Sequence, residues 1–162
     1  MILASCLLNG RTGHEAGRAL LAELYRRETG EELPPIAVET RGKPYFPDSP
    51  WHFSISHTKK HVFCVLAKEN VAIDAEELDR KINLTLADKI LSHGEKAQFD
   101  AATDKQRALL TFWVLKEAEA KLSGRGLHGY PNDTDFSLDD LRVREMDGCL
   151  VAIFTEGETY AV

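Results

Sequence analysis

Carboxylates are concentrated at the end of an apolar stretch in residues 71–78, which read VAIDAEEL. The apolar start predicts a β-strand, and side chains two residues apart on a strand project from the same face. Asp74 and Glu76 therefore share one face, and Glu77 points away from it. Two carboxylates on one face repel each other unless a cation lies between them, and oxygen ligands of this kind suit a hard cation such as Mg²⁺. The alternative is that these acids mark a solvated end of the strand.

A second candidate group lies in residues 112–126, which read FWVLKEAEAKLSGRG. The stretch predicts a helix that is apolar around nearly its whole circumference, as buried helices are. Glu117 and Lys121 nevertheless share one stripe of it, and charges in apolar surroundings are costly unless they are paired or bind something. Glu117 is thus a candidate third oxygen ligand. The alternative is an ordinary i,i+4 ion pair, worth about 0.2–0.5 kcal/mol on a surface.

Basic side chains accompany these acids. His57 ends the alternating stretch FSISH, and Lys116 and Lys121 flank Glu117 along the predicted helix. Histidine and lysine at such positions suit phosphate oxygens, so acids and bases together indicate phosphate or pyrophosphate chemistry with a divalent cation. A hydrogen-bonded structural role is the alternative for His57. The residues alone name no substrate.

Several local patterns predict the elements that must position these residues. Residues 1–8 form an apolar run typical of a strand, and a capping box from Thr12 to Glu15 begins a helix that Gly30 ends. Further strands are expected at 36–41, 52–58, 62–67 and 71–78, the last three close enough to form a meander.

The second half of the sequence is richer in helix signals. We expect helices from Thr85, from a capping box at Ser92, and from a third box at Thr103 that begins a helix reaching about residue 123. Strands at 141–145 and 150–155 follow, joined at residues 147–148. The pattern predicts one α+β domain of helices with hairpin-like strand neighbours.

Composition limits the partners. The chain has 162 residues and a formal net charge of −6, which disfavours nucleic acid. Its opening apolar run is too short to cross a bilayer, so no membrane association is expected. Cys6, Cys64 and Cys149 are far apart and odd in number, which indicates buried thiols in the reducing cytoplasm.

Four stretches in a fixed order carry a family resemblance. They are RGKPYFP, FSISHT, VAIDAEEL and FWVLKEAEAKLSGRG, within about residues 41–127. They resemble the G-K-P, F-N-x-S-H-S, G-I-D-x-E and W-x-x-K-E-(x)₃-K motifs of the 4′-phosphopantetheinyl transferases, specifically the larger, surfactin-synthetase-activating type. Each motif alone is weak, but the ordered series is specific. Ala72 stands where the family usually has glycine, and Ser54 where asparagine is usual.

The resemblance implies an activity. Such enzymes use Mg²⁺ to transfer the 4′-phosphopantetheine group of coenzyme A to a serine of an apo acyl or peptidyl carrier protein, releasing adenosine 3′,5′-bisphosphate. It also implies two similar α/β halves related by a pseudo-twofold axis, here about 1–70 and 71–162, with the site between them. A monomer would then suffice.

The resemblance also implies roles for individual acids. Asp74 and Glu76 match the metal-binding pair of the family, and Glu117 matches a further metal ligand that is also a candidate general base.

The matched basic and hydroxyl residues imply contacts to coenzyme A. Lys121 and His57 are the expected partners of its phosphates during transfer, with Ser56 beside His57, Lys43 from the G-K-P motif and, on a looser alignment, Arg18.

Two rival functions stay open at this point. The chain could be a catalytically degenerate module that binds coenzyme A or a carrier protein, or an unrelated metal-dependent phosphohydrolase. A basic patch for the acidic helical face of carrier proteins is expected in a transferase. The candidates are Lys59, Lys60, Arg80, Lys81 and Arg125.

Overall fold

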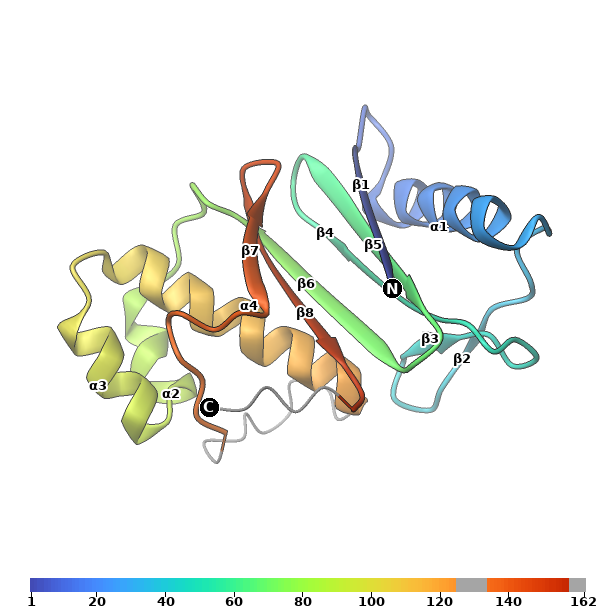
Figure 1. Cartoon of the computed structure of the whole chain (residues 1–162). Coiled ribbons are helices and arrows are strands. Elements are labelled where there is room, and N and C mark those ends of the chain that lie inside the picture. Colours follow the sequence, from blue (N-terminus) through green and yellow to red (C-terminus); the bar gives the residue numbers. More distant parts are fainter. Residues whose placement is uncertain (125–133, 158–162) are drawn as a thin grey trace.

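The computed structural model describes residues 1–124 and 134–157, which form two three-stranded antiparallel sheets, a small two-stranded sheet and flanking helices (Figure 1). This arrangement confirms the predicted α+β class. Among the described residues, no helix combines the length and apolar character needed to span a bilayer. The candidate basic residue Arg125 lies outside the described residues.

The first sheet is built from the N-terminal part of the chain. Its strand order is β1 (Ile2–Leu7), β5 (His61–Ala67) and β4 (His52–His57). The helix α1 (Gly13–Thr29) covers one face and buries Ala16, Leu21 and Leu24 against it. The predicted boundaries of α1 are confirmed, because Thr12 forms the capping box with Glu15 and Gly30 ends the helix at φ 76°.

The second sheet repeats the same connectivity. Its order is β6 (Val71–Glu77), β8 (Cys149–Thr155) and β7 (Val143–Met146), and α4 (Lys105–Ser123) covers one face. In each sheet the first strand is followed by a helix and a hairpin, and the last strand lies in the middle. The β7–β8 turn places Asp147 at φ 51° and Gly148 at φ 73°, the backbone that a two-residue hairpin favours.

The short helices of the second half precede α4. They are the 3₁₀ turn η1 (Leu84–Leu86), α2 (Ala87–Ile90) and α3 (His93–Ala101). The capping box predicted at Ser92 is confirmed for α3. The other two predicted starts are displaced, since Asn83 caps η1 and the Asp104 side chain, rather than Thr103, accepts the hydrogen bond from the Arg107 amide.

Between the two sheets lies a third layer of the core. The sheet faces that carry no helix pack against each other through fully buried side chains such as Phe63, Val65, Ile73 and Val151. Figure 1 accordingly shows the two sheets between α1 on one side and α4 on the other, with α2 and α3 beyond α4. The expectation that α4 is buried because it is apolar all round is confirmed, with Leu109, Phe112 and Leu115 fully enclosed.

The predicted meander is wrong at its third strand. β4 and β5 pair as expected, but β6 pairs with β8 in the other sheet. β6 still runs beside β4, but serine side chains take the place of the backbone carbonyls that normally accept hydrogen bonds between strands. The Ser54 and Ser56 hydroxyls accept hydrogen bonds from the Ile73 and Ala75 amides, each at 3.1 Å. We call this contact between β4 and β6 the seam.

The strand predicted at 36–41 is much shorter than expected. β2 covers only Ala37–Val38, and it pairs with β3 (Pro44–Tyr45). The chain turns early because the Glu39 amide bonds the Lys43 carbonyl at 2.9 Å and Gly42 adopts φ 92°.

The seam generates a stability prediction. Replacing Ser54 by alanine leaves the buried Ile73 amide without its acceptor, so we expect the free energy of unfolding to fall by about 1–3 kcal/mol. Urea unfolding followed by circular dichroism measures this. Ser137→Ala, at an exposed site, should change stability by about 0.5 kcal/mol or less. Equal losses in both variants would contradict the structural role of the seam.

Candidate active site

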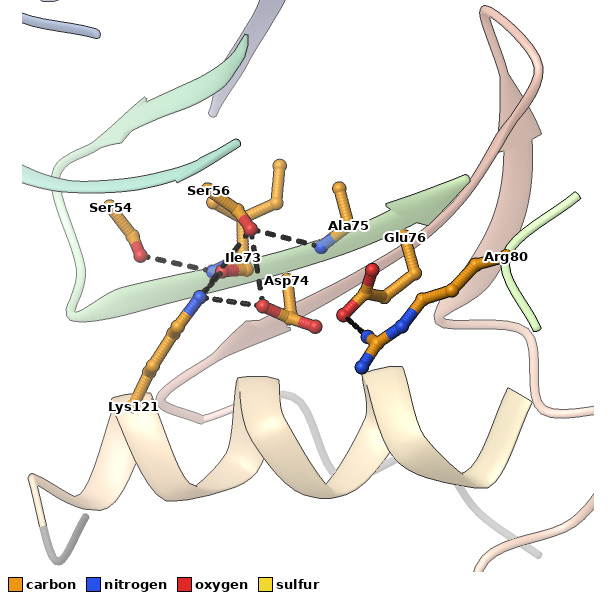
Figure 2. Close-up of polar contacts among 8 residues, drawn as sticks. All are labelled: Ser54, Ser56, Ile73, Asp74, Ala75, Glu76, Arg80 and Lys121. Carbon is orange, nitrogen blue, oxygen red and sulfur yellow. Dashed lines mark hydrogen bonds and ion pairs between the residues drawn. The ribbon is translucent and has the colours of Figure 1, made fainter. Parts of the chain in front are cut away.

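The predicted acids lie on the side of the seam that faces α4. Asp74 and Glu76 project from β6 toward that helix, as the strand alternation predicted (Figure 2). Asp74 is buried, and its Oδ1 accepts hydrogen bonds from Lys121 Nζ at 2.6 Å and from Ser56 Oγ at 3.1 Å. Lys121 also donates to the Ile73 carbonyl at 3.1 Å. The lysine of α4 is therefore fastened to the seam itself.

Ser56 has two tasks in this arrangement. Its hydroxyl accepts from the Ala75 amide and donates to Asp74, so the same oxygen joins the strands and orients the carboxylate. The side chain is buried. Its contact with coenzyme A stays a prediction.

Glu76 is paired with a different cation. Arg80, four residues further along, makes a close ion pair with Glu76 through Nη1. The guanidinium also lies over the Trp113 ring of α4, 5.5 Å from its centroid. This partner was missed from the sequence, although the i,i+4 spacing past the end of the strand was available as a signal.

Glu117 faces the same region from α4. It is buried, and loss of solvation followed by repulsion from Asp74 raises its pKa to about 7, against an attraction to Lys121 and Arg80. Asp74 and Glu117 are therefore close enough to repel each other.

The residues fit a divalent cation. Asp74 Oδ2 is buried without a hydrogen-bond partner among the described residues, and burial together with repulsion from Asp74 raises the pKa of Glu117. An Mg²⁺ ion bound by oxygens would relieve both conditions. Within residues 1–124 and 134–157 no three acidic, histidine or cysteine side chains are already grouped as a metal site. Asp74 and Glu76 are instead paired with Lys121 and Arg80, which direct the two carboxylates toward different partners.

A cavity of about 270 Å³ opens beside these acids. Glu117 and Lys121 line it from α4, and Lys43 lines it from the loop before β3. A second hollow of about 340 Å³ contains Arg18 and His57. Both are lined by Gly42, Pro44, Phe53 and Ile55. Four of the predicted contacts to coenzyme A thus lie along one groove, and the fifth, Ser56, lines neither hollow.

His57 is held at the mouth of the second hollow by a close packing contact. A Cβ at Gly13 would lie 2.4 Å from its ring, so only glycine fits at the start of α1. His57 itself is exposed and free to meet a ligand. The role of Gly13 was not evident from the sequence.

Lys43 is engaged at the end of α4. Its Nζ donates to Asn70 Oδ1 at 2.6 Å and to the Leu122 carbonyl at 3.2 Å, and burial lowers its pKa. Asn70 donates to the same carbonyl at 3.3 Å. Lys43 therefore joins the first half of the chain to the C-terminal end of α4 while it lines the cavity.

Lys116 does not face the groove, contrary to our expectation that it could contact phosphate. It is buried on the opposite side of α4, where its Nζ lies 2.8 Å from Glu95 Oε2 of α3. The Phe136 amide bonds the other oxygen of that carboxylate at 3.1 Å. The role of Lys116 is to hold α3 and residue 136 against α4.

The candidate basic patch surrounds a broad hollow of about 890 Å³ beyond His57. Its charge is mixed, because Lys60 lies 4.0 Å from Glu77 and 3.8 Å from Asp79. The lining residues include Lys59, Lys60, Arg80, Lys81, His57 and Glu76.

Comparison with known proteins agrees with this geometry. A family model described as the 4′-phosphopantetheinyl transferase superfamily matches residues 70–160, which include the seam strand β6 and the whole of α4. The chain belongs to this superfamily. The matched range contains Asp74, Glu76, Glu117 and Lys121.

Several relatives carry the same family name. The 4′-phosphopantetheinyl transferase AcpT of Escherichia coli O157:H7 is 35% identical over 114 residues, covering 67% of this chain and 56% of that protein. A 4′-phosphopantetheinyl transferase of Bacillus subtilis is 29% identical over 121 residues (73% and 50%), and Sfp of strain 168 is 36% identical over 96 residues (57% and 42%). The superfamily chain described here therefore spans about half the length of these curated relatives.

The raised pKa of Glu117 predicts a pH-dependent stability. Because its folded pKa of about 7 lies above the ordinary 4.5, the proton on Glu117 contributes stability that is complete at low pH and is lost as the pH rises through 7. Without divalent cations, the free energy of unfolding of Glu117→Gln should rise relative to that of the wild type by on the order of 3 kcal/mol between about pH 5 and pH 8.

Urea unfolding at several pH values, in the presence of a chelator, measures this difference. Glu23→Gln on the exposed face of α1 serves as the control for the removal of a carboxylate from the surface. A pH-independent difference for Glu117→Gln would show that this carboxyl titrates normally.

Proposed function

We propose that this protein transfers the 4′-phosphopantetheine group of coenzyme A to a serine of a carrier protein. The observation that carries the proposal is that Asp74 binds Lys121 at 2.6 Å beside a cavity that Lys121 and Glu117 line from α4. Glu76 projects from the same face of β6 as Asp74 (Figure 2). Family membership supports the class of reaction. We further propose that residues 1–70 and 71–162 act as two halves of one transferase domain in a monomeric, cytoplasmic enzyme of the Sfp type.

Asp74, Glu76 and Glu117 would hold the Mg²⁺ ion. The ion, when bound, would bind the pyrophosphate and polarise the reacting phosphorus. Asp74 Oδ2 supports this assignment, because it is a buried oxygen that has no hydrogen-bond partner among the described residues.

Glu117 is suited to act as the general base. A base must lie close to the proton that it accepts, and Glu117 lines the cavity from α4 beside Asp74. The carrier serine oxygen would form a bond to the phosphorus, its proton would pass to Glu117, and the phosphoanhydride bond would break. Adenosine 3′,5′-bisphosphate leaves with the electron pair of that bond.

The basic residues along the groove would bind the anionic substrate. Lys121 is fixed by the seam within the cavity, so its ammonium is already oriented for the phosphates. His57 and Arg18 share the adjoining hollow, and they would meet the phosphates of the nucleotide part. Preoriented cations of this kind stabilise the charge that develops during transfer.

The carrier protein would approach beside His57. The broad hollow there carries Lys59 and Lys81 on its rim, which suits an acidic helical face. The hollow is also lined by Glu76, Glu77 and Asp79, so docking would depend on these two lysines and not on a uniformly basic surface. The overall charge of −6 disfavours nucleic acid as a partner.

An intact-mass assay tests the proposal. The protein, coenzyme A, Mg²⁺ and an apo acyl or peptidyl carrier protein are incubated, and the carrier should gain one phosphopantetheine group. Asp74→Asn and Glu117→Gln should each lower the rate by about 10²–10³-fold, as expected for loss of a preorganised electrostatic contact. Glu23→Gln, on the outer face of α1, should retain the wild-type rate.

Two outcomes would contradict the transferase. Binding of coenzyme A without transfer to any of a panel of carriers would favour a degenerate binding module. Phosphate release from simple esters without a carrier would favour a phosphohydrolase.

A further inference from the structure

Arg80 occupies an unusual position for a surface arginine. Its guanidinium pairs with Glu76, one of the proposed metal ligands, and lies over the Trp113 ring at 5.5 Å. The Arg80 side chain is 39% exposed and that of Glu76 20%, so the pair lies at the edge of the site. Figure 2 shows Arg80 reaching back along the face of α4 toward Glu76.

The Trp113 contact places the Arg80 guanidinium beside α4, the helix that carries Glu117. Its charge lowers the pKa of Glu117, against the effects of burial and of Asp74. Trp113 and Glu117 lie one turn apart on α4, so the ring beside Arg80 and the Glu117 side chain are neighbours on that helix. A planar guanidinium held near an aromatic ring by a cation–π contact loses less freedom when it pairs with a carboxylate.

The consequence concerns Glu76. A carboxylate that is already paired with a resident guanidinium must leave it, or share it, before it can coordinate a divalent cation. A metal ion entering between Asp74, Glu76 and Glu117 would also experience repulsion from Arg80.

We propose that Arg80 is a positioning residue that sets the affinity of the acidic site for its divalent cation by competing for Glu76. The inference rests on the proposed metal-dependent function. Arg80 keeps the site electrostatically balanced without metal, and Trp113 holds the guanidinium in place for that purpose. Removing the guanidinium should therefore tighten metal binding, whereas a residue that only supports the fold would weaken it when replaced.

Manganese binding to the full-length protein tests this without an assay of activity. Mn²⁺ is titrated into the protein, and the free ion is followed by electron paramagnetic resonance. Arg80→Gln should bind Mn²⁺ about two- to fivefold more tightly than the wild type, the range expected for loss of one partly exposed ion pair. Arg80→Lys keeps the charge beside Glu76 and should stay within about twofold of the wild type.

A matched control separates this effect from net charge. Arg107 of α4 pairs with Glu145 of β7 on the exposed surface, so Arg107→Gln removes the same charge from another arginine–glutamate pair and should leave Mn²⁺ affinity unchanged. An unchanged or weaker affinity in Arg80→Gln, with a wild-type thermal unfolding midpoint, would overturn the proposal.

Trp113 supplies a second signal. In a Trp51→Phe background, Mn²⁺ should change the fluorescence of Trp113 as Glu76 moves away from the guanidinium, and Glu76→Gln should abolish this change. Failure of the metal site itself can be told apart with Asp74→Asn. If this variant binds Mn²⁺ as tightly as the wild type, both the metal site and the function built on it are overturned.

Discussion

The arrangement of the site depends on two serine hydroxyls. Where β4 and β6 run side by side, the backbone amides of Ile73 and Ala75 donate to the Ser54 and Ser56 side chains instead of to carbonyls. Buried amides must find acceptors, so the hydroxyls determine how the two sheets meet. Because Ser56 also donates to Asp74, the interaction that joins the sheets also orients the first acid of the site.

The second organising feature is a balance of charge. Asp74, Glu76 and Glu117 lie in a partly enclosed region, and carboxylates without counter-ions are costly there. Lys121 and Arg80 supply the counter-ions from within the chain. The remaining imbalance appears at Glu117, whose pKa rises to about 7, and at the unbonded Asp74 Oδ2. A divalent cation would supply the positive charge and the oxygen contacts that these two carboxylates lack.

Local signals in the sequence predicted most elements, whereas long-range pairing was not predictable. The Thr12 capping box and Gly30 bounded α1, and two-residue alternation placed Asp74 and Glu76 on one face. The predicted meander was wrong because the sequence of an apolar strand does not indicate which sheet the strand joins, and here β6 pairs with β8. Lys116 was misplaced because α4 is apolar all round, which leaves its groove-facing side unmarked.

The measurement that tests this account most directly is anomalous diffraction from crystals grown with Mn²⁺ and coenzyme A. We predict one strong anomalous peak in contact with Asp74 Oδ2 and the Glu117 carboxylate, with the pyrophosphate in the groove beside Lys121. That result would place the cation between Asp74 Oδ2, which has no hydrogen-bond partner among the described residues, and the Glu117 carboxylate of α4. A peak bound elsewhere, with the Asp74–Lys121 and Glu76–Arg80 pairs intact beside an ordered pyrophosphate, would contradict the account.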